Sequence, residues 1–498
     1  MDSSLNAGRR ARELRRVAEE RVDVLVVGLG ATGAGAALEA ASRGLSVAAV
    51  DAHDLAFGTS RWSSKMIHGG LRYLARGQVG IAHESAVERG ILLRTTAPHL
   101  VKAHPYVLPL TPAVSPRQAA LVMAGYRLGD GLRAAARTPR RLLPGPTRLT
   151  AARTRTLAPV LAADGLRGAL LSWDGRLLDD ARLVVALART AAAHGARVLT
   201  RCRALRLSDD GALVRDELTG EEFTLRARAV INATGVWAAT LDPQVKLRPS
   251  RGTHLVLAPG TLPGLIAGLH LPIPGETNRF ALVLPQRDGR IHVGLTDEPV
   301  DGPVPDVPEA PEEDVRALLK VLNGVLEVPV TREAVAGAYA GLRPLLAADG
   351  GTADLSRRHA VLSDGGIVTV VGGKLTTYRR MAEDAVDRAV ASRNLRAGRS
   401  RTRKLPLVGA GPQPDGAPPR LAERYGSEAL AVQALVKEHP EEVGLGITKG
   451  ELLWSVLHEG ALDEGDLLDR RTRIGLVRRD RDEALPAARD VLDRAART

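Results

Sequence analysis

The clearest pattern of apolar and polar positions lies between residues 22 and 51. The run from Val22 to Val27 is apolar and β-branched, has the length of a strand and ends at a glycine. An alanine-rich stretch typical of a helix follows and stops at Gly44, and the apolar segment 45–50 predicts a second strand. This order of strand, helix and strand predicts a βαβ unit near the start of the chain.

The turn between the first strand and the helix carries the pattern G-x-G-x-x-G at Gly28, Gly30 and Gly33. In a dinucleotide site the first glycine permits a tight turn, the second lets the backbone approach a pyrophosphate, and the third packs the helix on the strand. The helix N-terminus offers N–H groups to the phosphates. Asp51 ends the second strand, where an acidic side chain binds ribose hydroxyls. The combination predicts a dinucleotide site; a glycine-rich turn in an ordinary βαβ unit is the alternative.

Hydroxyl side chains crowd into a short stretch directly after this unit. Four of them precede a His-Gly-Gly sequence: Thr59, Ser60, Ser63 and Ser64, before His68, Gly69 and Gly70. Such a density of hydroxyl and backbone N–H groups is typical of a loop around a polar ligand. Capping of the next helix is the other interpretation.

Two later strands are predicted to return to the same sheet. The first is segment 228–233, which leads into the turn Ala233-Thr234-Gly235. The second is segment 367–371, which leads into Gly372-Gly373-Lys374 and then into a helix that continues to about residue 391. The second junction offers another site for an anion or a dipole at a helix N-terminus. A cofactor domain that closes only near the end of the chain fits FAD better than NAD, because nicotinamide enzymes usually carry a contiguous domain.

The segment between these junctions has a different pattern. From Val245 to about Ala340, short apolar runs alternate with Pro and Gly turns, which predicts an antiparallel sheet inserted into the cofactor domain. Earlier in the chain, residues 81–95 predict an amphipathic helix with Glu84 and Glu88 facing solvent. Residues 97–110 predict a strand that leads back to the cofactor sheet.

Composition narrows the class of protein. The chain of 498 residues is long enough for two or three domains, and its formal net charge of +12 suits nucleic acid, an anionic membrane or an anionic substrate. Its one cysteine, Cys202, excludes an intramolecular disulfide and gives no sign of a cysteine-based metal site. Residues 1–21 lack the apolar core of a signal peptide, and no apolar run approaches about 18 residues. We therefore expect an intracellular protein whose membrane contact is peripheral.

The most basic section is 117–148, where an apolar stripe is surrounded by arginines. A pair of helices on an anionic membrane surface would have this pattern, and so would a solvated basic face. Candidates for binding a small anion stand in loops beside predicted cofactor strands and are Arg72, Arg343, Arg357 and Lys374. Taken singly, each is better explained as a surface charge, but together with the glycine turns beside them they favour an anion site. The candidate general bases are His68, His254 and His359.

With these motifs in place, the chain resembles the FAD-dependent glycerol-3-phosphate dehydrogenases of the respiratory, quinone-linked type. The matching segments cover nearly the whole chain: SSKMIHGGLRYL (63–74), DDARLVVALA (179–188), INATGVW (231–237), RGTHLV (251–256), GLRPL (341–345), LSRRH (355–359) and VVGGKLTTYRRMAEDAVD (370–387), with HEGA and RRTRIGL near the C-terminus.

The resemblance implies an α/β fold with a Rossmann-like FAD-binding domain of glutathione-reductase type, an inserted antiparallel β substrate domain and a helical C-terminal domain. The expected boundaries are 22–240 and 341–395 for the two parts of the FAD-binding domain, 241–340 for the substrate domain, 396–420 for a linker and 421–498 for the helical cap. No metal is expected.

The resemblance also implies a function. The expected reaction is oxidation of sn-glycerol 3-phosphate to dihydroxyacetone phosphate, by hydride transfer from C2 to the flavin, with the electrons passed to a membrane quinone. The usual assembly is a homodimer attached peripherally to an anionic membrane surface, here the inner face of the cell membrane.

Carried over by position, Arg72, Arg357 and Lys374 would hold the substrate's phosphate, and Arg343 would orient the reacting hydroxyl. His254 is the preferred base, with His68 second. The residues expected to contact FAD are Gly28, Gly30, Ala31, Thr32, Gly33, Asp51, Ala52, Thr59, Ser60, Ser63, Ser64, Lys65, His68, Gly69, Gly70, Ala233, Thr234, Gly235, Gly373, Lys374, Leu375 and Thr376.

The sequence leaves alternatives for one turn, for the electron acceptor and for a nucleic-acid partner. The family's G-T-T-D is here Gly294-Leu295-Thr296-Asp297, which leaves the role of that turn undefined. An oxidase of the same fold would pass its electrons to oxygen instead of quinone. A flavoprotein that acts on RNA would also be basic, but here the charge is spread along the chain without interleaved aromatic residues, so we expect no nucleic-acid partner.

Overall fold

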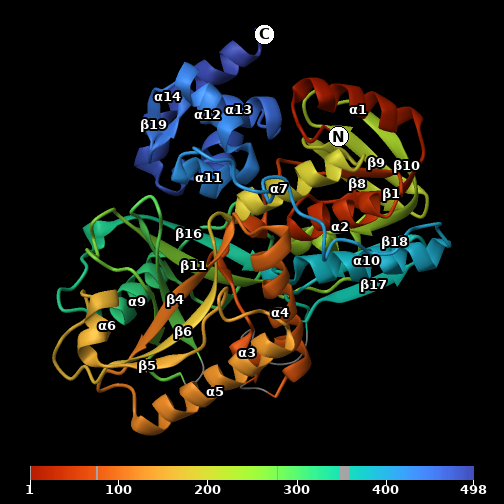
Figure 1. Cartoon of the computed structure of the whole chain (residues 1–498). Coiled ribbons are helices and arrows are strands. Elements are labelled where there is room, and N and C mark those ends of the chain that lie inside the picture. The colour runs from red at the N-terminus through yellow and green to blue at the C-terminus, as the bar shows by residue number, and fades with distance from the viewer. Residues whose placement is uncertain (1, 75–76, 277–278, 348–357, 498) are drawn as a thin grey trace.

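A mixed sheet of eight strands with a parallel centre is one of the two main sheets of the structure, a computed structural model that describes residues 2–74, 77–276, 279–347 and 358–497 (Figure 1). β1 (Val22–Val27) lies between β2 (Val47–Val50) and β10 (Glu222–Asn232), and the three run parallel. The strand order is β17-β18-β10-β1-β2-β7, with β8 and β9 joined through β10. The other bounds are β7 (Arg197–Leu199), β8 (Cys202–Ser208), β9 (Gly211–Asp216), β17 (Ala360–Asp364) and β18 (Ile367–Val371).

Helices bury both faces of this sheet. Val24 and Val26 share one apolar core with α2 (Ala31–Ser42), α7 (Asp180–Ala193) and α10 (Tyr378–Arg393). Leu25 and Val27 point to a second core, to which α1 (Ala7–Glu19) contributes Val17. A strand buried on both faces has no polar side, which explains why β1 is wholly apolar from Val24 to Val27, with Asp23 partly exposed near its start. The predicted βαβ unit and the two return strands, β10 and β18, are confirmed.

The second sheet has ten strands in the order β15-β11-β14-β13-β12-β4-β6-β3, with β16 paired to β11 and β5 to β6. Its pairs are antiparallel except for β12 and β4. The bounds are β3 (Met66–Ile67), β4 (Val101–Pro109), β5 (Thr147–Leu149), β6 (Ala169–Leu177), β11 (Ser250–Leu257), β12 (Gly268–Pro272), β13 (Phe280–Pro285), β14 (Ile291–Gly294), β15 (Glu298–Pro299) and β16 (Val335–Arg343). α9 (Glu312–Asn323) packs its apolar face against this sheet.

The prediction that segment 97–110 leads back to the cofactor sheet is wrong. The segment forms β4, which pairs along its whole length with β6 and belongs to the second sheet. Residues 66–177, placed by the sequence in the first part of the FAD-binding domain, therefore supply four strands, β3 to β6, to the other sheet. An apolar run shows that a strand is buried, but only its partner decides which sheet it joins.

Two predicted helices also differ from expectation. α4 (Val79–Ile91) exists, but Glu88 is buried and accepts hydrogen bonds from Nε and Nη2 of Arg379 at 2.7 and 2.6 Å. The ion pair with Arg379 of α10 therefore explains why Glu88 is buried although it was expected to face solvent.

Section 117–148 forms one helix, α5 (Pro116–Ala135), rather than a pair, and its Leu121 and Leu128 are 71 % and 63 % exposed. The short helices are α3 (Leu71–Leu74), α6 (Ala151–Leu157) and α8 (Ala238–Leu241).

The C-terminal part is helical, as expected. It contains α11 (Pro419–Tyr425), α12 (Ala429–Glu438), α13 (Lys449–His458) and α14 (Arg478–Ala495), with the hairpin β19 (Glu442–Gly444) and β20 (Ile447–Thr448). In Figure 1 these elements lie together beside α1, at the opposite end of the molecule from α5. Segment 396–420 is packed rather than loose, since Ser400 and Thr402 donate to buried Glu39 at 3.1 and 2.5 Å. Among the described residues, no helix has the length and apolar character needed to cross a bilayer.

Candidate cofactor and substrate site

A cavity of about 1160 Å³ lies where the two sheets meet. Its walls include the ends of β1 and β18 from the first sheet and residues of β11 and β13 from the second. In open α/β sheets, ligands bind at the carboxyl ends of the strands, which is where this cavity begins.

The glycine turn after β1 forms one wall of the cavity, with Gly28, Gly30, Ala31 and Thr32. Gly28 has φ +98°, and a Cβ there would lie 2.7 Å from the carbonyl oxygen of Ala233. A Cβ on Gly33 would lie 1.8 Å from the carbonyl oxygen of Gly28, so Gly33 does not line the cavity but lets α2 pack on the turn. The two glycines thus let the turn pack tightly on β10 and α2, and this packing leaves backbone of the turn at the cavity wall.

Asp51 lies at the cavity wall just after β2. Its carboxylate accepts hydrogen bonds from the backbone N–H groups of Leu29 at 2.7 Å and His53 at 2.8 Å. Burial raises the pKa of Asp51 to about 6, against the lowering effect of those two hydrogen bonds. Hydroxyl donors placed on this carboxylate would favour its charged form.

Residues 51–64, here called the cofactor loop, line the cavity with Ala52, Thr59, Ser60, Ser63 and Ser64. The Ser60 hydroxyl accepts a hydrogen bond from the Ala31 N–H at 2.9 Å, so the loop is tied to the start of α2. Lys65, expected among the cofactor contacts, lies outside the cavity wall. Its buried ammonium donates to Asp180 at 3.0 Å, and burial lowers its pKa to about 8.

Of the predicted contacts that follow this loop, some line the cavity and others do not. His68 lines the cavity, whereas Gly69 and Gly70 are absent from its wall. A Cβ on Gly69 would lie 2.5 Å from Nη1 of Arg89, which pairs with Asp174 at 2.6 Å. Gly69 therefore makes room for a buried ion pair rather than for a ligand.

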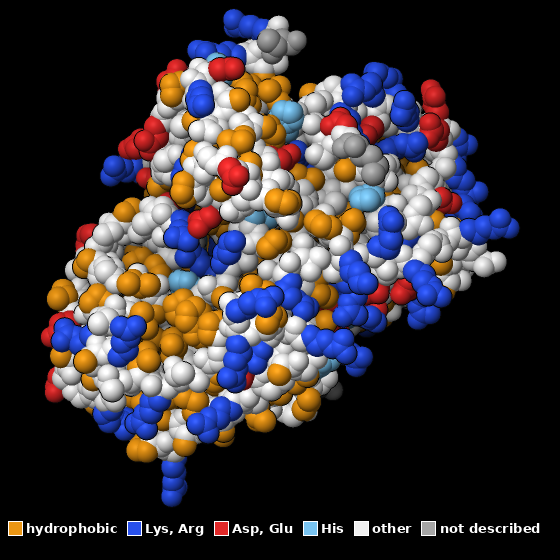
Figure 2. All heavy atoms as spheres, in the orientation of Figure 1, with side chains coloured by type: hydrophobic (Ala, Val, Ile, Leu, Met, Phe, Trp, Pro, Cys, Tyr) orange, Lys and Arg blue, Asp and Glu red, His pale blue; other side chains and the backbone are white. Residues whose placement is uncertain are grey.

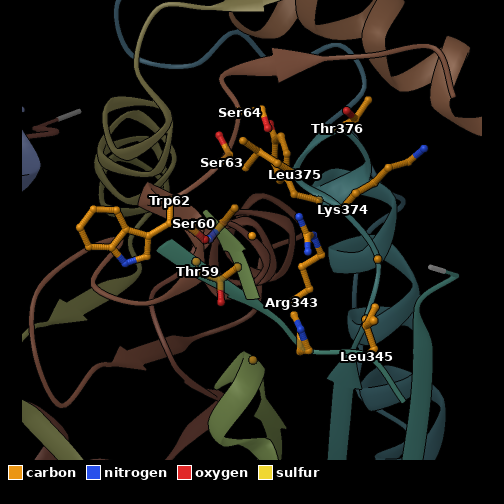
Figure 3. A pocket seen from close by; sticks show the side chains of 18 of the residues that line it. Thr59, Ser60, Trp62, Ser63, Ser64, Arg343, Leu345, Lys374, Leu375 and Thr376 are labelled. Carbon is orange, nitrogen blue, oxygen red and sulfur yellow. The ribbon is translucent and has the colours of Figure 1, made fainter. Parts of the chain in front are cut away.

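The wall next to the glycine turn comes from the two return strands. After β10, Ala233, Thr234 and Gly235 line the cavity, and after β18 it is lined by Gly373, Lys374, Leu375 and Thr376. The Lys374 ammonium hydrogen-bonds to Ser85 and lies 4.3 Å from the centre of the Tyr73 ring. In Figure 3, Arg343 lies between the 374–376 turn and Thr59 and Ser60 of the cofactor loop.

His254 reaches the cavity from β11. Its Nε2 is 2.8 Å from the Ser64 hydroxyl, and its ring stacks on Tyr339 of β16 with centres 4.8 Å apart. Burial, then the charges of Lys65 and Arg343, lower the pKa of His254 to about 3. The imidazole is therefore neutral at physiological pH.

Arg343 ends β16 and is fixed by the turn whose role the sequence left open. Its Nη1 donates to Asp297 at 3.0 Å and to the Ser250 hydroxyl at 3.1 Å, and its Nη2 donates to the Thr296 carbonyl at 3.2 Å. Gly252 is needed here, because a Cβ at that position would lie 2.3 Å from Nη2. The Gly294–Asp297 turn thus aims the guanidinium, and Leu295 of the same turn lines the cavity.

Besides Gly33, Lys65, Gly69 and Gly70, three further predicted residues are not placed at the cavity by what the structure describes. His359 pairs with Asp384 of α10 at 2.8 Å and is absent from the cavity wall. Arg357 lies outside the described residues, and the side chain of Arg72, in α3, is likewise not described.

Comparison with known proteins agrees with this geometry. The family model described as "FAD dependent oxidoreductase" matches residues 23–379, and "C-terminal domain of alpha-glycerophosphate oxidase" matches residues 400–498. The chain is 52 % identical to "Glycerol-3-phosphate dehydrogenase 1" of Mycobacterium tuberculosis over 99 % of both chains. It is 34 % identical to "Glycerol-3-phosphate dehydrogenase, mitochondrial" of Bos taurus, over 95 % of this chain and 70 % of the other.

The chain belongs to the FAD-dependent glycerol-3-phosphate dehydrogenase family. Among solved structures, the glycerol-3-phosphate dehydrogenase from Bacillus halodurans complexed with FAD is similar over 98 % of this chain and 94 % of that one, with a TM-score of 0.75 and 26 % identity. The fold is shared with an FAD-bound L-alpha-glycerophosphate oxidase from Mycoplasma pneumoniae, which has a TM-score of 0.59 and 19 % identity over 78 % of this chain and 99 % of the other.

FAD is the cofactor of this family, and the residues present fit it. The glycine turn, with no room for a Cβ, suits the pyrophosphate, and the Asp51 carboxylate suits ribose hydroxyls. The cavity volume of about 1160 Å³ exceeds that of ordinary drug-sized pockets, about 300–1,000 Å³, as a dinucleotide with a substrate beside it requires.

The cavity also has a branch that the sequence did not reveal. It runs between α5 and the second sheet and is lined by Leu121, Val122, Tyr126, Leu128, His270 and Phe280. Helical spacing places Leu121, Val122 and Leu128 on one face, which was visible as an apolar stripe. That this stripe opens into the same cavity as the glycine turn depends on the pairing of distant strands.

Proposed function

We propose that the protein oxidises sn-glycerol 3-phosphate to dihydroxyacetone phosphate and passes the electrons from FAD to a membrane quinone. The observation that carries the proposal is one cavity that joins a dinucleotide-type turn to an end lined by the cations Arg343 and Lys374 and by the neutral His254. The chain is 52 % identical, over 99 % of both chains, to a protein named for glycerol 3-phosphate.

Substrate binding would fall to the positive side chains. Lys374, whose ammonium is held by Ser85 and Tyr73, supplies a positive charge for a phosphate, and Arg343 supplies a rigid fork that is already aimed by Asp297. Arg72 and Arg357, by their sequence positions, are proposed to complete the phosphate site. When bound, FAD supplies the two-electron acceptor for the hydrogen on C2.

His254 is proposed to take the proton from the C2 hydroxyl. Its Nε2 lies 2.8 Å from the Ser64 hydroxyl, and both residues line the cavity. A substrate hydroxyl could reach Nε2 by replacing the Ser64 contact. The low pKa favours release of the proton once the oxidised product forms, because a buried imidazolium beside Lys65 and Arg343 is unstable. His68, also at the wall, is the second candidate.

The apolar branch favours a quinone over oxygen as acceptor. Oxygen needs no apolar channel, whereas a quinone ring and tail do, and exposed Leu121 and Leu128 give the channel an apolar mouth. Arginines on α5 and just after it are exposed, namely Arg117, Arg127, Arg137 and Arg141, which suits peripheral attachment to an anionic membrane. We propose that this end of the molecule meets the inner face of the cell membrane, and that the protein works as a homodimer.

Nucleic acid is not proposed as a partner. Figure 2 shows lysine and arginine side chains scattered over the whole visible face, with no single basic groove. Grooves for single-stranded nucleic acid combine such charge with a row of exposed aromatic side chains.

Anaerobic stopped-flow measurement of flavin absorbance tests the proposal. Mixing the FAD-loaded protein with sn-glycerol 3-phosphate should bleach the flavin within seconds, and a soluble quinone should restore the colour much faster than oxygen does. Fast recovery with oxygen would make the protein an oxidase. A flavin that sn-glycerol 3-phosphate leaves coloured would overturn the substrate.

A further inference from the structure

The cofactor loop has a second face that the function described above does not use. Most of its residues line the cavity, but Asp54, Leu55, Ala56 and Arg61 do not and are almost completely buried on the other side. Ala56 has φ +60°, a conformation that is unfavourable for alanine. A segment with this conformation and a buried carboxylate needs support from outside itself.

That support comes from the C-terminal part of the chain. Arg471 donates to both carboxylate oxygens of Asp54, at 2.7 and 2.9 Å, and Arg470 donates to one of them at 2.7 Å. Arg473 donates to the backbone carbonyl of Arg61 at 2.5 Å, near the other end of the same loop. Three arginines in one short segment thus hold the loop at two points.

The arginines are themselves fixed. Arg470 also pairs with buried Asp466 at 2.5 Å, and Arg471 donates to the carbonyl of Glu459 at 2.8 Å. The Glu459 side chain binds both terminal nitrogens of Arg182 on α7, at 2.8 and 3.0 Å. The contact between the C-terminal part and the loop is therefore a rigid, buried, charge-paired network rather than a surface salt bridge.

We propose that Arg470 and Arg471 are positioning residues for FAD: through Asp54 they hold the cofactor loop so that Asp51 and the loop hydroxyls face the cofactor. This gives the C-terminal domain a role in cofactor retention, although it contributes no residue to the described cavity wall. The inference rests on the proposed assignment of Asp51 and the cofactor loop to FAD.

The test measures FAD affinity in the full-length protein, with the flavin removed and returned. Asp54→Asn keeps the size of the side chain and removes its charge, and it should raise the Kd for FAD at least about tenfold, as loss of an outer-shell partner does at other cofactor and metal sites. Arg470→Lys keeps the charge but loses the fork and should raise the Kd less. Addition of FAD should also slow hydrogen exchange of the amides of residues 466–473, because coupling between two sites is reciprocal.

A matched control separates positioning from general stability. Arg189 and Glu428 form a two-point pair of the same kind, at 2.7 and 2.8 Å, between α7 and the C-terminal part, and they do not touch the loop. Glu428→Gln should leave the Kd for FAD within twofold of wild type. The proposal is overturned if Asp54→Asn binds FAD as tightly as wild type, or if Glu428→Gln weakens FAD equally.

Asp51→Asn distinguishes this proposal from the one on which it rests. If Asp51→Asn weakens FAD and Asp54→Asn and Arg470→Lys do not, the positioning role alone is wrong. If none of the three weakens FAD, the loop is not the cofactor site. Should Asp54→Asn fail to fold, Arg470→Lys and the hydrogen-exchange measurement on the wild type still decide, since unchanged FAD affinity together with unchanged exchange contradicts the proposal.

Discussion

The two ends of the cavity are built in different ways. The nucleotide end uses backbone and short side chains from consecutive residues, the glycine turn and the cofactor loop, with Asp51 as its main charged group. The substrate end uses long or aromatic side chains from strands distant in the sequence, since His254 and Tyr339 face each other only through the pairing of β11 and β16. The first end is a local structure, and the second is a product of tertiary pairing.

The difference has a functional consequence. A site made of backbone depends on conformation and tolerates few changes of shape, as the missing space for a Cβ at Gly28 and Gly33 shows. A site made of charged side chains depends on what holds each charge, as Asp297 holds Arg343. Substitutions at the substrate end should therefore alter turnover with FAD still bound, and substitutions at the nucleotide end should alter FAD binding first.

The largest effect is expected at His254. His254→Asn removes the proposed base and should slow flavin reduction by sn-glycerol 3-phosphate about 1,000-fold while FAD stays bound. His359→Asn, at a histidine outside the cavity wall, is the control and should reduce at the wild-type rate. An equally large loss in His68→Asn, with His254→Asn near normal, would transfer the role to His68.

The next effect is at the residue that aims Arg343. Asp297→Asn removes the charge that Nη1 of Arg343 contacts at 3.0 Å and should lower kcat/KM for sn-glycerol 3-phosphate about tenfold. Asp288→Asn breaks a similar pair with Arg290, 2.7 Å apart, just before β14, and serves as the control. Steady-state kinetics would contradict the account if both variants lost the same amount.

Asp51 gives a dependence of FAD binding on pH. In the flavin-free protein its pKa is raised to about 6, so the carboxyl becomes protonated as the pH falls from 7 to 5. Ribose hydroxyls favour the charged form, so FAD should bind about tenfold more weakly at pH 5 than at pH 7. Fluorescence titration of Asp51→Asn should show weaker binding without this pH dependence, and a wild-type affinity that stays constant over this range would refute the assignment.

The free energy of unfolding of the flavin-free protein has a different pH dependence. Because the pKa of Asp51 is raised on folding, its contribution to the free energy of unfolding declines as the pH rises from about 4 to about 6.

The smallest effect is expected at the mouth of the apolar branch. Leu121→Ser with Leu128→Ser should lower turnover with a quinone a few-fold and weaken binding to anionic vesicles, with flavin reduction unchanged. Val328→Ser alters a residue that is 75 % exposed outside the cavity wall and should change neither. Wild-type quinone turnover in the double variant would remove the support for this branch as the acceptor channel.

The same contrast explains what could be predicted from the sequence. The glycine turn, Asp51 and the hydroxyls of the cofactor loop could be predicted because they come from one short stretch of the chain. Residues that are close together in that stretch also lie close together at the cavity wall. His254 and Arg343 were only two of several candidates in the sequence, and it was the resemblance to a family that gave each of them its role.

Residues whose role depends on distant partners were missed or misplaced. Lys65 stands between residues that line the cavity, yet its ammonium turns to Asp180. Glu88 was expected at the surface and is paired with Arg379. β4 was assigned to the wrong sheet because its apolar pattern carries no information on its partner. In each case the deciding contact joins segments more than 50 residues apart in the chain.

The most direct test of the division between the two ends is one measurement on Arg343→Ala. We expect a yellow protein with the wild-type content of FAD. Its flavin should be reduced by sn-glycerol 3-phosphate about 100- to 1,000-fold more slowly than in wild type. A variant that loses its FAD would show that the two ends are not independent. A variant that holds FAD and is reduced at the wild-type rate would show that Arg343 does not belong to the substrate site.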